Sequence, residues 1–180
     1  MIRSARTMAA TAILACASLA GLAIADQSGK SDKPASQKEI AQPFLDGLVG
    51  SWTTQSKGVH EGVQMTGSGV STWERGIGGT ALLQTYEGSM PGPDGKMMQL
   101  HGHGIYKVSD DGKTATVWWF CNMSPDVMKL TGSATDSGIH LTGESPMGNK
   151  VDLSFEKNDT GLIFKMTEGT NELSETYKRK

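Results

Sequence analysis

Two histidines one residue apart are the side chains in this sequence best suited to metal chemistry. His101 and His103 occur in the run His-Gly-His-Gly. Residues i and i+2 of a β-strand point to the same face, so both imidazoles could reach one divalent ion. A structural zinc site has four protein ligands and a catalytic one has three plus water, and the spacing assigns neither Cys121 nor Glu87 to the remaining places. The alternative is a strand with both histidines on its polar face. The sequence favours this alternative, and we predict no metal and no cofactor.

Other catalytic arrangements are missing from the sequence. There is no Gly-x-Ser-x-Gly nucleophile motif. Acidic residues are scattered rather than paired, so general acid–base catalysis has no visible site. Cys121 ends the apolar run Val-Trp-Trp-Phe-Cys, which is typical of a buried, unreactive thiol. We therefore predict that the protein is not an enzyme.

Aromatic side chains supply the candidate ligand-binding set. Seven of them are spread over several predicted strands, so closure of a barrel would bring some together inside: Trp52, Trp73, Tyr86, Tyr106, Trp119, Phe120 and Phe164. Methionines add an adaptable apolar lining. Barrels of about eight strands are often filled by side chains, whereas about ten strands can leave space for one ligand. The sequence leaves a solid core and a cavity as open alternatives.

These side chains would be positioned by a run of β-hairpins. Apolar residues recur at every second position, as in Val151, Leu153 and Phe155. Gly-, Asp- and Asn-rich turns separate about ten such runs at roughly 8–12-residue spacing, and no long helical pattern lies between them. The predicted fold is therefore an all-β, antiparallel up-and-down barrel of about ten strands. Glycines within the predicted strands mark bends or close backbone approaches that favour closure: Gly67, Gly69, Gly88, Gly102, Gly104, Gly132 and Gly143.

The N-terminal region is predicted to lie outside the barrel. Residues 1–25 combine a short basic head, an apolar stretch and the small-residue ending Ala-Ile-Ala, the pattern of a secretory signal cleaved after Ala25. The stretch is too short and too alanine-rich to favour a membrane span. A lipidated Cys16 is the alternative, although Leu14 departs from the lipoprotein pattern. Residues 26–37 are polar and predict a flexible linker. The domain would occupy 38–180, with a short helix over 38–48 that Pro43 limits.

The charge of the chain argues against a nucleic-acid partner, and its cysteine content bears on whether the exported protein could form a disulfide. The chain has 17 basic and 19 acidic residues, so it has no basic field for nucleic acid. Cleavage after Ala25 would leave Cys121 as the one cysteine, and the exported fold could then contain no internal disulfide. We expect a secreted or periplasmic protein with no nucleic-acid partner and no membrane span. The oligomeric state is not predicted.

Several motifs resemble those of a known family. The run 48–52, Leu-Val-Gly-Ser-Trp, is similar to the Gly-x-Trp signature that opens the first strand of lipocalin-type barrels. The segments 67–73, 78–88 and 118–123, followed by the closing 176–180, occur in the order seen in the bacterial family called domain of unknown function 1579. The resemblance covers about residues 40–180. It implies a lipocalin-like barrel without an agreed activity.

The resemblance extends to neighbouring barrel families that carry small hydrophobic ligands or, in nitrobindin-like proteins, heme held by a histidine near the C-terminal strands. Residues 171–180 of this sequence contain no histidine, so the resemblance does not imply heme here. The function predicted from the sequence is an exported, non-catalytic barrel that binds a small apolar ligand inside. The first alternative is an envelope structural or protein-interaction module with a solid core, which would use loops such as 88–96. A metal-dependent enzyme built on His101 and His103 is the last alternative.

Overall fold

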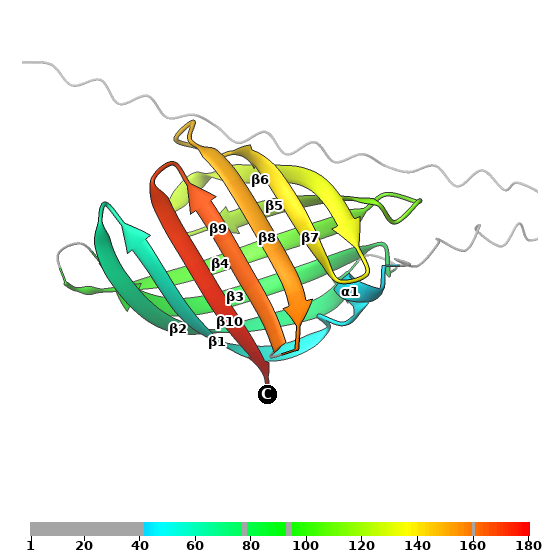
Figure 1. The fold of residues 1–180 in the computed structure, drawn as a ribbon, viewed down its shortest axis with the longest axis horizontal. Helices are drawn as coiled ribbons and strands as arrows, with labels where there is room; N and C mark the ends of the chain where they lie inside the picture. Colours follow the sequence, from blue (N-terminus) through cyan, green and yellow to red (C-terminus); the bar gives the residue numbers. More distant parts are fainter. Residues whose placement is uncertain (1–41, 77–78, 93–94, 160) are drawn as a thin grey trace, which may run out of the picture. The chain divides into compact units, whose positions relative to one another are not determined.

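The described residues form ten strands, which make one closed antiparallel barrel (Figure 1). The computed structural model describes residues 42–76, 79–92, 95–159 and 161–180. After the short helix α1 (Pro43–Asp46), the strands are β1 (Gly50–His60), β2 (Val63–Gly76), β3 (Ala81–Pro91), β4 (Met97–Val108), β5 (Thr114–Cys121), β6 (Ser124–Thr135), β7 (Gly138–Glu144), β8 (Lys150–Asn158), β9 (Gly161–Glu168) and β10 (Asn171–Arg179).

Each strand pairs with its neighbours in the sequence, and β1 closes the barrel against β10. This confirms the up-and-down antiparallel barrel of about ten strands. The topology gives the barrel two distinct ends. We call the end with α1 and the β2–β3, β4–β5, β6–β7 and β8–β9 connections the helix end. The opposite end carries the five hairpins β1–β2, β3–β4, β5–β6, β7–β8 and β9–β10, and we call it the hairpin end.

Helix α1 begins at Pro43 and is followed by Gly47. Pro43 occupies the first helical turn, where its missing N–H costs nothing. The extended Gln42 caps the helix, accepting a hydrogen bond from the Leu45 N–H at 2.8 Å and donating one to the Thr135 carbonyl. The described helix is therefore shorter than the predicted range 38–48, and residues 1–41, including the predicted signal and linker, lie outside the described residues. Within the described part of the chain, no helix is long and apolar enough to cross a membrane.

Aromatic rings fill the helix end of the barrel. The Phe155 ring lies at its centre, 4.9 Å from the Tyr177 ring, 5.6 Å from Phe44 and 5.8 Å from Trp73, measured between centroids. Tilted and edge-on pairs of this kind stabilise a core beyond their buried area, by about 0.5–1.5 kcal/mol each. Leu45 and Leu48 are fully buried in the same cluster. The helix therefore closes this end as part of a solid core.

The strand glycines allow close approaches, as predicted. A Cβ atom at each of them would stand 2.1–2.7 Å from a neighbouring atom: Gly67, Gly69, Gly88, Gly102, Gly104, Gly132 and Gly143. At Gly88 the neighbour is the Tyr86 ring, and at Gly102 it is the Trp119 ring. Both rings therefore lie against strand backbone, in space that a side chain at the glycine would occupy.

A two-residue turn fixes the register of β1 against β2. Glu61 and Gly62 both have positive φ, 49° and 81°, as the tight hairpin turn that suits twisted strands requires. His60 and Val63 are the first pair of the ladder, and the pairing continues without a shift to Gly50 and Trp73. Alternation along β1 then places Thr54, Ser56 and Gly58 on the inward face.

Candidate functional site

The barrel interior contains a buried carboxylate surrounded by hydroxyl groups. Glu175 on β10 is 4% exposed. Its Oε1 accepts hydrogen bonds from the Ser56 hydroxyl at 2.6 Å and the Tyr86 hydroxyl at 2.7 Å. Its Oε2 accepts one from the Tyr177 hydroxyl at 2.9 Å. Ser56 is the direct β1 partner of Glu175, whereas Tyr86 reaches it from β3. Strands distant in the sequence thus converge on one acidic group.

Glu175 affects the pKa values of all three tyrosines of the chain. Burial, followed by the negative charge of Glu175, raises the pKa of Tyr86 to about 12. The same two causes raise the pKa of Tyr106 and of Tyr177 well above the ordinary value near 10. At neutral pH the phenols are therefore neutral hydrogen-bond donors and cannot serve as bases.

A second polar chain runs beside the first. The Tyr106 hydroxyl donates to Gln84 Oε1 at 2.8 Å, and Gln84 Nε2 donates to the Ser71 hydroxyl at 3.0 Å. Two buried polar atoms in this part of the interior make no hydrogen bond of regular geometry with the described residues, Thr54 Oγ1 and Trp73 Nε1, although Thr54 interacts with the Tyr86 hydroxyl. Thr54 Oγ1 and the Tyr86 hydroxyl both lie 2.9 Å from the point where a Cβ on Gly69 would stand. The Thr54 hydroxyl therefore lies beside the carboxylate network, with hydrogen-bonding capacity remaining.

A groove of about 730 Å³ lies at the hairpin end, and its lining includes the apolar Gly58, Met166 and Leu173 as well as the charged Lys57 and Lys165. Gly58 and Leu173 line it and are partners across the β1–β10 ladder. The next inward pair along the same two strands is Ser56 and Glu175. Two residues of strand correspond to about 7 Å, so the lining of the groove ends one inward pair from the buried carboxylate.

Methionines dominate the inward positions around the hairpin end. Five of them are neither fully buried nor exposed and lie in phase with inward residues of their strands: Met65, Met90, Met98, Met128 and Met166. Met90 and Met98 are direct partners across β3 and β4. Flexible thioether side chains adapt to irregular apolar shapes, so this half of the interior has a deformable lining.

Exposed apolar residues also gather at the hairpin end. The large hydrophobic side chains that are exposed in the described chain are Val63, Met97, Phe120, Met123, Val127 and Met147. All six lie in or beside the hairpins β1–β2, β3–β4, β5–β6 and β7–β8. Met147, in the β7–β8 turn, is 76% exposed. The described residues of the helix-end connections 108–114, 135–138 and 158–161 are mostly polar or glycine.

The seven predicted aromatic residues are divided between different surroundings. Trp52, Trp73, Tyr106 and Phe164 belong to or pack against the core of the helix end. Tyr86 and Trp119 lie inside, on the inward glycines of β3 and β4. Phe120 is 40% exposed and pairs with the outward His103, so it lies on the outer face. The structure therefore leaves Tyr86 and Trp119 as the members of the set nearest the hairpin-end interior.

His101 and His103 lie together on the exposed outer face of β4. His103 Nδ1 lies 3.3 Å from the Thr85 hydroxyl, and His101 pairs with Glu87 in the ladder. Cys121 pairs with the inward Gly102, so it does not join the histidines. Within the described ranges, no group of three or more His, Cys, Asp or Glu side chains could hold a metal ion.

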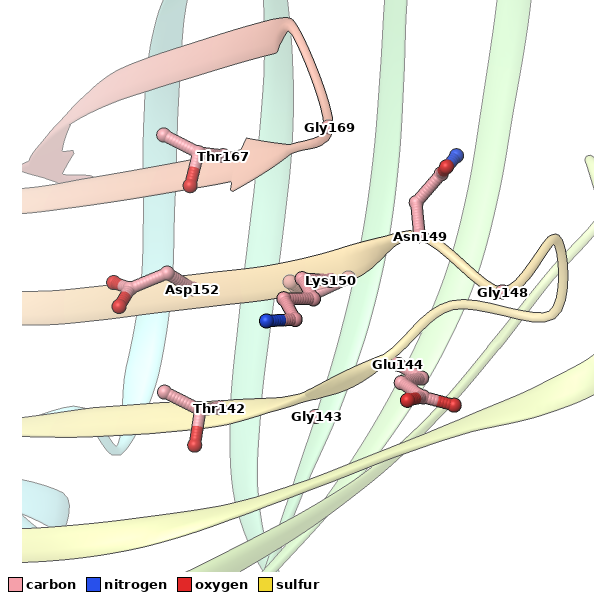
Figure 2. A pocket seen from close by; sticks show the side chains of 10 residues that line it. Thr142, Gly143, Glu144, Gly148, Asn149, Lys150, Asp152, Thr167 and Gly169 are labelled. Atoms are coloured by element: carbon pink, nitrogen blue, oxygen red, sulfur yellow. The ribbon is translucent and has the colours of Figure 1, made fainter.

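A second hollow, of about 770 Å³, lies outside the barrel on β7, β8 and β9 (Figure 2). Figure 2 shows Thr142, Asp152 and Thr167, which are successive partners across these strands. Asp152 also forms an exposed pair with His140, whose Nε2 lies 2.9 Å from Oδ1. An exposed ion pair of this kind contributes little to stability. The other side chains that line the hollow do not point toward one another (Figure 2). The hollow is a shallow surface depression.

Glu175 was missed by the sequence analysis, although a signal for it exists. Glu175 lies between Leu173 and Tyr177 at spacing two, so the β-period places a carboxylate on the face with the apolar residues. An acidic residue in phase with core residues is unusual and indicates a buried polar group. Its partners Ser56 and Tyr86 lie 119 and 89 residues away, and no local pattern connects them to it.

Comparison with known proteins gives a family without an assigned activity. No curated protein matches the sequence. A family model described as a protein of unknown function, DUF1579, matches residues 37–158. The match covers the chain through β8, whereas Glu175 and Tyr177 on β10 lie beyond it. As the resemblance of its motifs predicted, the chain belongs to the DUF1579 family.

Proposed function

We propose that this protein is an exported, non-catalytic barrel that binds a small, mostly apolar ligand in the hairpin-end half of its interior. The groove whose lining ends one inward pair from Ser56 and Glu175 carries the proposal. Its lining combines apolar residues in inward phase, such as Met166 and Leu173, with polar residues at its rim such as Lys57. Ligand sites are typically apolar with a few placed polar groups, and here those groups are the hydroxyls around Glu175.

The chemistry of the interior supports binding rather than catalysis. Raised pKa values keep the phenols neutral, so they can donate hydrogen bonds but not take up protons. Ser56 donates directly to Glu175, with no histidine between them to act as a general base. Export is supported by the basic head and apolar stretch of residues 1–25. An intact mass with Asp26 at the N-terminus is the expected result for the exported protein, and a lipidated Cys16 would contradict cleavage there.

Ligand retention provides the direct test. Native mass spectrometry of protein purified from its own host should show a bound small molecule, or an apolar fluorescent dye should bind to the emptied protein. Leu173→Trp would fill the groove from β10 and should abolish dye binding. Thr176→Trp places the same ring on the exposed face of the same strand and should leave binding unchanged. Absence of both retained ligand and dye binding would refute the proposal.

A second candidate function is an envelope protein-interaction module. The six exposed apolar side chains at the hairpin end favour it, because large exposed hydrophobic residues that cluster often mark contact sites. In this case one protein partner should be captured from envelope extract, and capture should be lost in a Met123→Ser, Met147→Ser variant. Dye binding in the interior should be unaffected by those changes. The two functions are therefore distinguishable.

A further inference from the structure

Glu175 is a buried charge that no basic side chain neutralises in the described chain. No ion pair links its carboxylate to a lysine or arginine among those residues. Three neutral hydroxyls solvate it instead. Buried carboxylates are normally compensated by a cation or a metal, because hydroxyl donors replace only part of the lost hydration. The interior therefore has an electrostatic preference for a positive group beside Glu175.

The carboxylate also retains an unused acceptor position. A carboxylate offers about four lone-pair sites, two on each oxygen. Oε1 accepts from both Ser56 and Tyr86, so its two sites are taken. Oε2 accepts from Tyr177, and no second donor to it is found among the described residues. A further donor can thus be added at Oε2 without displacing a protein group.

Thr54 provides an independent sign that a polar group belongs at this position. Its side chain is 0% exposed, and its Oγ1 makes no hydrogen bond of regular geometry, although it interacts with the Tyr86 hydroxyl. A hydroxyl has one donor and two acceptor positions, so Thr54 Oγ1 can take a further partner. Thr54 is two residues from Ser56 on the same inward face, and its hydroxyl is near that of Tyr86. A ligand group with several donors could meet both Thr54 Oγ1 and Glu175 Oε2.

From these observations we propose that the ligand is a cationic amphiphile, with an apolar body against Met65, Met166 and Leu173 of the groove and a protonated amine beside Glu175. This inference rests on the proposed function and specifies its ligand class. An ammonium group has three donors and no acceptor, which suits a site with acceptor capacity remaining at a carboxylate and a hydroxyl. A carboxylate ligand of the same length would bring a second negative charge to Glu175 and bind more weakly.

Three probes with one chain length test the preference. Dodecylamine, dodecanol and dodecanoate differ in head-group charge, and their binding at neutral pH can be followed by calorimetry below their aggregation concentrations. Dodecylamine should bind about tenfold or more tighter than dodecanol, because a hydrogen bond to a charged group contributes more than a neutral one. Dodecanoate should bind most weakly. Equal binding of all three would overturn the inference while leaving the proposed function standing, whereas no binding of any probe would refute the proposed function itself.

Two substitutions and a control connect the preference to Glu175. Glu175→Gln keeps the shape of the side chain and removes its charge. The affinity for dodecylamine should therefore fall to within about threefold of the affinity for dodecanol. Glu156→Gln on the exposed face of β8 makes the same chemical change away from the site and should leave the preference intact. Tyr86→Phe keeps Glu175 but removes one neutral donor to Oε1, so the amine preference should persist or increase. Loss of the preference in folded Tyr86→Phe protein would contradict a direct contact between ligand and carboxylate.

Discussion

The two ends of this barrel use the same strands for different purposes. At the helix end, α1 and the rings around Phe155 make a core whose side chains are nearly all buried. At the hairpin end, the inward positions hold glycines and partly exposed methionines above a buried carboxylate. The loops differ in the same sense, since the exposed large apolar residues of the described chain all lie at the hairpin end. The aromatic part of the core thus lies at the helix end, although the buried Val151 extends the core toward the β7–β8 hairpin.

The strongest test of this division removes the centre of the aromatic core. Phe155→Ala should lower the free energy of unfolding by about 3–5 kcal/mol, because a cavity opens where four rings meet. Met166→Ala at the hairpin end should cost less, about 1–2 kcal/mol, because its side chain is already partly exposed. Urea denaturation of both variants measures the difference. Equal losses would mean that the hairpin end is packed as tightly as the core.

Alkaline pH should produce the next largest effect, through the tyrosines around Glu175. The pKa of Tyr86 is about 12 in the folded protein and near 10 in the unfolded chain. Between these two pH values the folded state binds more protons than the unfolded state. The stability that the raised pKa of Tyr86 contributes is therefore complete below pH 10 and is lost as the pH rises toward 12. Tyr106 and Tyr177 shift in the same direction.

Two measurements check the alkaline prediction. The urea midpoint should be steady up to about pH 9 and fall between pH 10 and pH 12. Tyrosinate absorbance of the native protein should rise only well above pH 10. Glu175→Gln removes one cause of the raised pKa values and should move the absorbance change to lower pH, although burial, the larger cause, remains. Native tyrosines that ionise near pH 10 would show that the phenols are accessible to solvent.

A smaller and more local effect is expected from Gly88→Ala. The added Cβ would stand 2.6 Å from the Tyr86 ring and hydroxyl, so the ring must leave its position against β3. The cost should be about 1–3 kcal/mol, the range for overpacking. Losing the bond to Glu175 should also lower the pKa of Tyr86 toward 10. Tyrosinate titration should then show one of the three tyrosines ionising earlier than the others.

Gly143→Ala is the matched control for this change. Its Cβ would approach Leu130 Cδ2 and the Lys129 carbonyl, both at 2.7 Å, away from the tyrosines. The variant should lose stability while its tyrosine titration remains that of the parent protein. A titration change in both variants would indicate general loosening rather than a specific displacement of Tyr86.

The fold was more predictable from the sequence than the candidate site, for a physical reason. Alternating residues such as Val151, Leu153 and Phe155 and the glycine-rich turns report local backbone preferences, and an up-and-down barrel needs pairings only between sequence neighbours and one closure. The site depends instead on which inward positions reach the same level of the barrel. That level is set by register across the whole sheet, so the meeting of Ser56, Tyr86 and Glu175 has no local sequence signal.

The aromatic residues illustrate the same limit. The prediction that closure brings aromatic rings together holds for Trp73 and Tyr106, whose centroids are 4.9 Å apart. Residue type alone could not distinguish rings that fill a core from rings that border a groove. For Phe120, the alternation of the strand decides the face on which the side chain lies, although the residue is hydrophobic. Phe120 lies on the outer face, between the inward residues Trp119 and Cys121.

The smallest expected change in stability comes from the exposed tip of the β7–β8 hairpin. Met147→Ser should alter the free energy of unfolding by no more than about 0.5 kcal/mol, because the methionine is 76% exposed and buries little. The same replacement at the fully buried Leu141, on the adjoining strand, should destabilise by about 3 kcal/mol or more. If the hairpin end serves the interaction function, Met147→Ser should weaken that contact despite its neutral effect on folding. If Met147→Ser instead destabilised the protein as much as Leu141→Ser, this hairpin would be part of the core, and the contrast between the two ends would be lost.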